Sequence, residues 1–206
     1  MANVTSVKSK FFGAVDATDD NGLSVAATIG SATTLTLGGA LTSGGSYTSG
    51  DNIGQLITIL SAGDDSGITF TIVGTDAVGD AQTEVVTGAD TATATSSGYF
   101  NTVASITTSA ASAGDVSAGV TGTGTGTIFA GRTRVRGLQG LSAATAGNLL
   151  FKNTSVTGTT LLTVPTQAAA ELIEPYIPDN GVLFDAGAYV SFSAGLAAGV
   201  TVFYDG

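Results

Sequence analysis

The sequence contains no cysteine, no histidine and no tryptophan. Without cysteine there is no disulfide bond and no thiol nucleophile, and without cysteine or histidine a structural zinc site is excluded. The abundant serine and threonine hydroxyls have no histidine to act as their general base. The three glutamates, Glu84, Glu171 and Glu174, are not accompanied by the tryptophan-rich surface typical of sugar-cleaving carboxylate pairs. The sequence therefore predicts a protein that is not an enzyme and needs no cofactor.

Basic residues are also scarce, with six Lys and Arg against sixteen Asp and Glu, a formal net charge of −10 and a pI of about 4.1. Such a charge repels phosphate, and the few arginines cannot form the broad basic surface that nucleic-acid binding uses. No apolar run approaches the roughly 18–20 residues of a membrane-spanning helix. We therefore expect neither nucleic acid nor membrane as a partner. The N-terminal stretch also lacks the features of a signal peptide, which predicts assembly inside the cell.

Gly, Ala, Ser and Thr make up more than half of the chain, while charged residues are only 11%. Short Thr- and Val-rich segments recur between Gly- and Asp-containing turns, which is the pattern of an all-β protein. A single helix is predicted over 166–174, with Thr166 as its N-cap and Pro175 after its end. The predicted strands are 32–37, 55–60, 68–73, 82–86, 92–95, 103–108, 116–120, 133–138, 148–152, 160–164, 182–184, 189–192 and 200–204.

The expected architecture is an Ig-like β-sandwich followed by a second small β-sandwich or jelly-roll-like domain, with almost no helix. Residues 1–30 are predicted to be an N-terminal arm or loop region, and 31–121 the Ig-like sandwich. The repeat TGTGTGT lies at the start of a Gly/Thr linker over 122–131, and 132–206 forms the C-terminal domain. An edge strand or hairpin arm is the alternative interpretation of that repeat. Leu56, Ile57, Ile59, Phe70, Ile72, Val85, Val103 and Ile106 are predicted to form most of the first core.

Acidic residues cluster in loops at positions 16–21, 64–65 and 76–80. Oxygen-rich loops can bind Ca²⁺, but their spacing does not match a known calcium-binding loop. Asp and Asn are also the residues that tight turns favour, because their side chains accept backbone hydrogen bonds. We therefore favour turn formation and predict no metal site.

Three arginines fall within five positions, after a stretch from Phe11 to Gly131 that contains no basic residue. On a β-strand, residues two apart point to the same face, so the three form one stripe while Thr133 and Val135 face the other way. The stripe is either a solvated face balanced by Asp residues of the same chain, or a contact with an acidic surface of a shell protein or a neighbouring copy. The N-terminal arm is expected to pack on a neighbouring subunit. The predicted interface residues are Arg132, Arg134, Arg136, Phe11 and Phe12.

The stretch from Gly54 to Gly122 resembles a module of the virion structural proteins of tailed phages. The similar features are a GTDA-x-G turn in ITFTIVGTDAVGD, an E-x-V-x-G strand in TEVVTG, and a YF-x-x-V-x-S-I segment in YFNTVASI. The C-terminal part, NGVLFDAGAYVSFSAGLAAGVTVFYDG, looks like the ending of small phage structural proteins. Together the two resemblances cover about half of the chain, and neither carries catalytic residues.

The resemblance implies a non-enzymatic virion protein, most consistent with a capsid decoration (cement) protein that stabilises the phage head. It would form a homo-oligomer, a trimer in our prediction, bound to the major capsid protein or another virion protein on the capsid surface after assembly in the host cytoplasm. A tail, collar or head-fibre component is the first alternative. A secreted bacterial adhesin or surface-layer protein that binds glycans or Ca²⁺ is the second.

Overall fold

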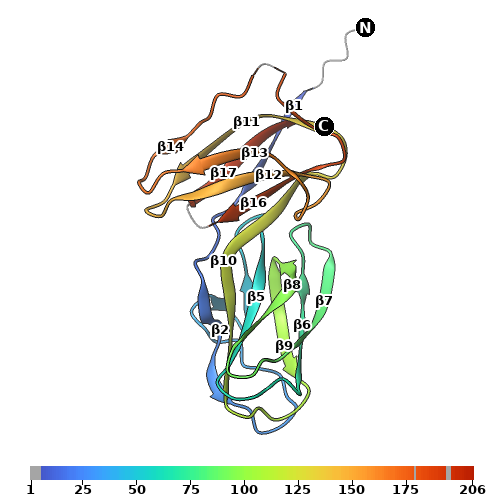
Figure 1. Cartoon of the computed structure of the whole chain (residues 1–206), viewed down its shortest axis with the longest axis vertical. Coiled ribbons are helices and arrows are strands. Elements are labelled where there is room, and N and C mark those ends of the chain that lie inside the picture. The colour runs from blue at the N-terminus through green and yellow to red at the C-terminus, as the bar shows by residue number, and fades with distance from the viewer. Residues whose placement is uncertain (1–5, 179, 194–195) are drawn as a thin grey trace. The chain divides into compact units, whose positions relative to one another are not determined.

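The structure, a computed structural model, describes residues 6–178, 180–193 and 196–206, and these residues form strands, turns and loops without a helix (Figure 1). The protein is therefore all-β, as predicted. The strands are β1 Val7–Phe12, β2 Asp19–Thr28, β3 Thr42–Ser43, β4 Ser46–Thr48, β5 Gly54–Ser61, β6 Thr69–Thr75, β7 Ala81–Thr87, β8 Thr93–Phe100, β9 Thr102–Thr108, β10 Asp115–Phe129, β11 Thr133–Ser142, β12 Gly147–Asn153, β13 Thr160–Thr166, β14 Leu172–Ile173, β15 Val182–Phe184, β16 Ala188–Ser193 and β17 Leu196–Asp205.

The chain folds into two compact units, and neither is a single continuous stretch of sequence. Unit 1 combines the N-terminal segment up to Val15, residues Gly50–Ile53 and residues Thr123–Gly206. Unit 2 consists of Asp16–Ser49 and Gly54–Gly122. The boundary lies between Gly122 and Thr123, whereas the sequence placed the start of the C-terminal domain at residue 132, after a linker. The N-terminal segment, however, is divided between the two units.

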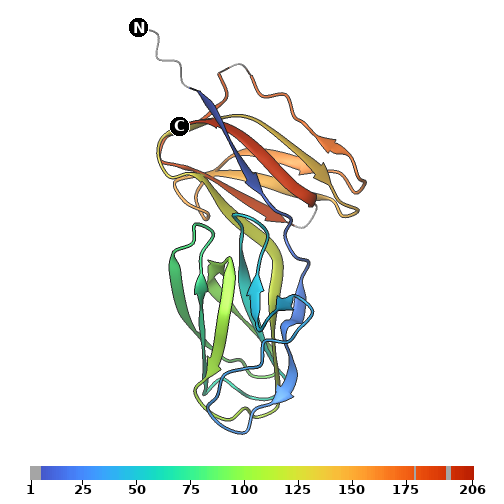
Figure 2. The same cartoon turned by 180° about the vertical axis from the view of Figure 1, so that it is seen from behind.

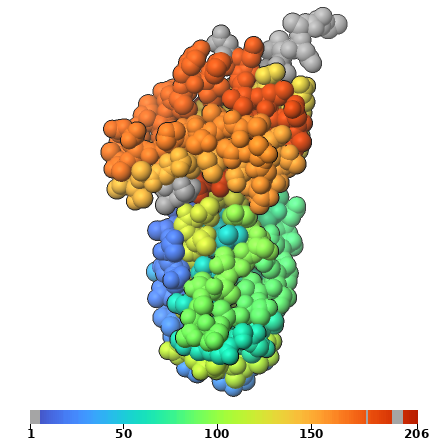
Figure 3. All heavy atoms as spheres, in the orientation of Figure 1, coloured from blue at the N-terminus to red at the C-terminus, as the bar shows by residue number. Residues whose placement is uncertain are grey.

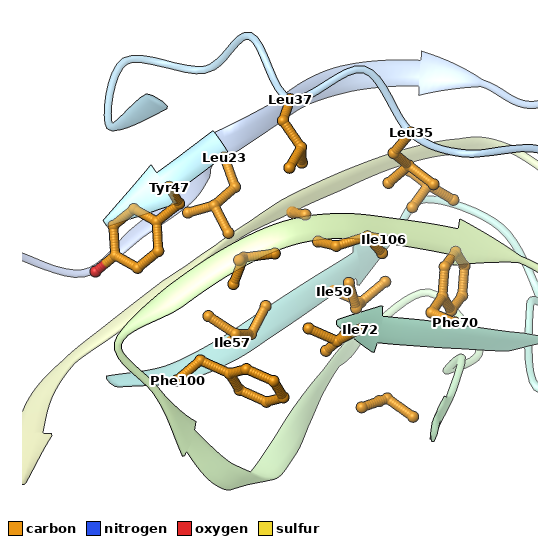
Figure 4. Packing of buried hydrophobic residues seen from close by; sticks show 14 of the residues in the cluster. Leu23, Leu35, Leu37, Tyr47, Ile57, Ile59, Phe70, Ile72, Phe100 and Ile106 are labelled. Atoms are coloured by element: carbon orange, nitrogen blue, oxygen red, sulfur yellow. The ribbon is translucent and has the colours of Figure 1, made fainter. Parts of the chain in front are cut away.

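Unit 2 is a β-sandwich with its core between two antiparallel sheets. One sheet contains β2, the first part of β10, β5 and β8, and the other runs in the order β3-β4-β9-β6-β7. Figure 4 shows Ile57 and Ile59 of the first sheet beside Phe70, Ile72 and Ile106 of the second, all fully buried. Burying apolar area at roughly 25 cal/mol per Å² is the main force that holds the two sheets together.

Six of the eight predicted core residues are fully buried, but two of the assignments are wrong. Leu56 is only half-buried, and Val85 is 60% exposed. Strand β7 pairs with β6 so that Val86 lies opposite Phe70, and directly opposed residues share a sheet face. Val86, and not Val85, is therefore the buried residue of the two. Which of the two is buried depends on the register between β7 and β6.

Unit 1 is a second β-sandwich. One sheet contains β13, β12, β16 and the later part of β10, and the other runs β1-β17-β11-β14, with β15 also paired to β11. The dark blue β1 lies along the dark red β17 in Figure 2. The core joins aromatic residues from both sheets, and the rings of Phe12 and Phe192 lie 5.9 Å apart between their centroids.

The N-terminal region is part of the two sandwiches and does not form a separate arm over 1–30. Strand β1 pairs with β17 from Val7 to Phe12, and β2 pairs with the first part of β10. Phe12 is fully buried in the core of unit 1, so its assignment to an intermolecular interface is wrong. The sheet partners of these strands lie about 100 or more residues away along the chain, so local pattern gave little indication of them.

The TGTGTGT repeat lies within β10 and is not a linker, which confirms a strand as its conformation. The glycines make room for bulky neighbours. A Cβ atom built on Gly124 would lie 2.6 Å from the Ile53 side chain, and one on Gly126 would lie 2.4 Å from the Phe12 ring. The alternating glycines therefore lie on a strand face that other side chains approach closely. Close approach of this kind is one reason why glycine occurs within strands.

The predicted helix over 166–174 is absent. Thr166 ends β13, a bend follows, and Leu172 and Ile173 form β14 opposite Leu141 and Gly140. Burial of Ile173 in the core outweighs the helix propensity of the three alanines before it, because tertiary packing overrides intrinsic propensity. The segment 32–37 is also not a regular strand, because only Thr34 makes a bridge, to Thr107.

Candidate interaction surfaces

The three arginines lie where the strand pattern predicted them. Thr133 and Val135 are buried, 4% and 0% exposed, and point into unit 1. Arg134 and Arg136 belong to β11 and are half-buried on its other side, while Arg132 immediately precedes the strand and is exposed. The alternation between basic and buried residues is therefore real.

Each arginine has a partner within unit 1. The Arg132 guanidinium lies 3.5 Å from Asp185, and the Arg136 guanidinium lies 3.6 Å from Asp205. Arg134 donates a 3.0 Å hydrogen bond to the carbonyl oxygen of Asn180. These contacts match the interpretation of a solvated face balanced by the same chain. The Arg132–Asp185 pair contributes little, because its side chains are 68% and 71% exposed and such pairs are worth about 0–1 kcal/mol.

Phe11 lies on the same outer sheet face as the arginines. In the register of β1, β17 and β11, Val7 lies opposite Asp205, which lies opposite Arg134. Four residues further along β1, and therefore on the same face, Phe11 lies opposite Thr201, which lies opposite Gln139. The structure thus brings Phe11 and the arginine segment, which lie about 120 residues apart in the sequence, to one surface. We call this surface the arginine face, and it consists of Val7, Phe11, Arg132, Arg134, Arg136, Gln139, Thr201, Phe203 and Asp205.

Aromatic rings cover glycines on the arginine face. The Phe11 ring lies 2.8 Å from the position of a Cβ atom on Gly199, and the Phe203 ring lies 3.7 Å from that on Gly137. Phe11 nevertheless remains 42% exposed. Aromatic residues and arginine are the residue types enriched in protein–protein interfaces, so this combination suits a docking surface.

The basic residues of the chain all belong to one of the two units. All six basic residues belong to unit 1, which also has six acidic residues and therefore a formal charge of zero. Unit 2 has no basic residue and carries the whole net charge of −10, on Asp16, Asp19, Asp20, Asp64, Asp65, Asp76, Asp80, Glu84, Asp90 and Asp115. The sequence showed the uneven distribution, but the structure adds that the basic residues and the acidic stretch belong to different folded units.

Two of the acidic loops contain carboxylates that accept hydrogen bonds within the loop itself. Asp64 Oδ1 accepts hydrogen bonds from the backbone N–H and the hydroxyl of Ser66, and these bonds hold the pKa of Asp64 below its usual value. Asp76 accepts in the same way from the N–H groups of Val78 and Asp80. Such contacts are typical of Asp in turns. In the part of the chain that the structure describes, no three acidic side chains converge as a metal site would require.

Glu84 links the two sheets of unit 2 along one side of the sandwich. From β7 its carboxylate accepts hydrogen bonds from the N–H and hydroxyl of Ser97 and from the N–H of Gly98, at 2.7 to 2.9 Å. These two residues belong to β8 in the opposite sheet. Glu84 therefore joins the edges of the two sheets, which is a structural role.

Gln55 is a buried polar centre in unit 2 that the sequence analysis missed. Its side-chain amide donates to the carbonyl oxygens of Asp16 and Thr121, at 3.0 and 2.7 Å, and its Oε1 accepts from the backbone N–H of Asp16. The Tyr47 hydroxyl lies 2.9 Å from Gln55 Oε1 and 2.8 Å from Asp16 Oδ2. Burial raises the pKa of Tyr47. The only indication in the sequence was a single glutamine in the otherwise apolar strand GQLITIL.

Comparisons with protein-family models, with curated proteins and with solved structures found no match to this chain. Among the described residues, there is also no helix with the length and apolar character that crossing a membrane requires.

Proposed function

We propose that this chain is a non-enzymatic structural protein of a tailed-phage particle, of the capsid decoration type, which attaches through the arginine face. The observation that carries the proposal is the arginine face itself, where exposed Phe11 and the three arginines lie on one side of the sheet formed by β1, β17 and β11. Residues 54–122 and the C-terminal part resemble phage structural proteins, and this resemblance supports a tailed phage as the source of the particle.

The arginine face fits an acidic partner surface. Arginine pairs carboxylates through two parallel hydrogen bonds and loses its water more easily than lysine does. Arg134 donates to the neutral carbonyl oxygen of Asn180, and the Arg132 pair is highly exposed, so both guanidinium groups can bind a carboxylate of the partner. The partner in this proposal is the major capsid protein or another virion protein, and the chain binds it as a homotrimer.

The attachment is tested by adding the purified protein to particles that lack it and measuring the bound fraction. Replacing Arg132, Arg134 and Arg136 by Ser is expected to leave the protein folded but to weaken attachment. Attachment of the unchanged protein should also weaken at high salt, where charges are screened within a few Å. Lys152→Ser is the matched control, because Lys152 belongs to β12 in the other sheet of unit 1. Equal attachment of the triple variant and the control would contradict this role of the arginine face.

The position in the particle is tested by quantitative mass spectrometry of purified particles. A copy number close to that of the shell protein is expected for a decoration protein. A copy number of a few tens or fewer would assign the chain to the tail, collar or head fibre instead. Absence from particles, together with stabilisation by added Ca²⁺, would favour a secreted surface protein, because a bound ligand raises the free energy of unfolding.

A further inference from the structure

Unit 2 has an uncharged groove at the edge of its sandwich opposite the Glu84 contact. The groove has a volume of about 440 Å³ and lies between residues 24–30, which are the second half of β2 and the two residues after it, and residues 33–38, with Val116 also contributing. This volume is in the range of ligand-binding pockets. The blue atoms of the β2 segment form a rim of unit 2 in Figure 3.

One wall of the groove is a strand edge. From Ser24 to Thr28, β2 pairs with β10, and the sheet order gives it no second neighbour among the described strands. In the part of β2 that precedes the groove, the segment around residues 39–41 covers the strand edge. The N–H of Gly39 donates to Leu23 O at 3.0 Å, and the N–H of Leu41 donates to Gly22 O at 2.8 Å. These two bonds go to the carbonyl oxygens of consecutive residues, so they hold the covering segment against β2 without forming a regular ladder. The covering segment then turns away where the groove begins.

The edge lacks the features that usually prevent strand addition. Proteins protect exposed edges with charged residues or proline, and the groove is lined by neither. Val25 is 58% exposed, and the small Ala26 and Ala27 beside it are also exposed. The pairing of β2 with β10 has one extra β2 residue between Ser24 and Ala27, and this bulge is a protective feature that the edge does have.

The charges around the groove indicate the kind of partner. Asp20 lies on β2 before the groove, and Asp115 lies at its other end, where it accepts a hydrogen bond from Thr28. Because unit 2 carries ten carboxylates and no basic residue, two copies of unit 2 repel each other at this site. An uncharged groove with an acidic residue toward each end instead complements a strand with an apolar centre and basic ends.

We propose that the groove binds an extended segment of another protein, which adds as a strand to the edge of β2 between Ser24 and Thr28. The segment has β-branched apolar residues at alternate positions and Lys or Arg at its ends. Backbone hydrogen bonds to β2 supply affinity, and the alternate side chains that enter the groove supply specificity. This proposal concerns a different unit from the arginine face and does not depend on the proposed function.

The test uses the full chain and a fluorescent peptide of sequence Lys-Val-Thr-Val-Thr-Val-Lys, with binding measured by fluorescence anisotropy. Saturable binding is expected. Val25→Asp should weaken it by about tenfold or more, because the peptide would bury an unpaired carboxylate. Val78→Asp is the matched control, since Val78 is 55% exposed in the loop between β6 and β7 of the same unit, and it should leave the affinity unchanged. Thermal melting of both variants checks that they remain folded.

Two further peptides test the mode of binding. A peptide with proline in place of the central valine lacks a backbone donor and should not bind, and one with glutamate at both ends should bind much more weakly. The proposal is overturned if the basic peptide does not bind saturably, if both protein variants weaken it equally, or if the proline or glutamate peptide binds as well. Self-association of the wild-type protein that Val25→Asp abolishes would assign the groove to a second copy and would also overturn the proposal.

Discussion

Replacing Gly126 by alanine adds one methyl group to β10, at a position that resembles a flexible linker in sequence. In the structure the new Cβ atom would lie 2.4 Å from Cε1 of Phe12 and 2.6 Å from the carbonyl oxygen of Asn52. Carbon atoms in contact are normally about 3.5–4.0 Å apart, so a neighbour must move by roughly 1 Å. Phe12 has little freedom to move, because it is fully buried and packs against Phe192. We expect the free energy of unfolding to fall by about 2–3 kcal/mol, as in other overpacked cores.

Urea denaturation of the full chain, followed by circular dichroism, measures this loss in the transition of unit 1. Gly30→Ala is the control, because a Cβ atom on Gly30 meets no other atom within 4 Å. In a flexible linker, Gly126→Ala would leave stability unchanged or raise it by about 0.4–1 kcal/mol through the lower entropy of the unfolded chain. A Gly126→Ala protein as stable as the Gly30→Ala protein would therefore refute the packing argument.

Three further substitutions test unit 2, each by urea denaturation. Phe70→Ala should lower the free energy of unfolding by about 3–5 kcal/mol, whereas Val85→Ala, at an exposed position, should change it by less than about 0.5 kcal/mol. Gln55→Leu should cost about 2–5 kcal/mol, since it removes the partners of the backbone N–H and C=O of Asp16; a cost below about 1 kcal/mol would contradict the importance of this centre. Because burial raises the pKa of Tyr47, the stability that its neutral hydroxyl contributes is complete below about pH 10 and is lost as the pH rises further, by up to about 1.4 kcal/mol per pH unit. Tyr47→Phe should make this alkaline slope clearly smaller, and an unchanged slope would argue against the assignment.

The strands were predictable where a short apolar pattern lies between turn residues. The segment 182–184 coincides with β15, and 55–60 lies within β5. The stripe of Arg134 and Arg136 opposite buried Val135 was likewise predictable, because side chains alternate along any strand. These features depend only on local geometry and on the separation of apolar from polar residues.

The partners of the strands were not predictable in this way. Pairing of β1 with β17 joins the two ends of the chain, and it buries Phe12 while its neighbour Phe11 joins the arginine face. A change of one residue in the register of β1 would exchange these two roles. Both residues were assigned to the same interface because nothing in the local sequence distinguishes them.

By itself, the sequence determined the all-β class, the position of most strands and the concentration of negative charge before residue 131. Only the tertiary structure decided that TGTGTGT is a strand, that Thr166 is followed by a bend and not a helix, and that β2 has an open edge beside an uncharged groove. The physical reason is that strand propensity and alternation act over a few residues, whereas sheet pairing and close packing depend on residues that are distant in the chain.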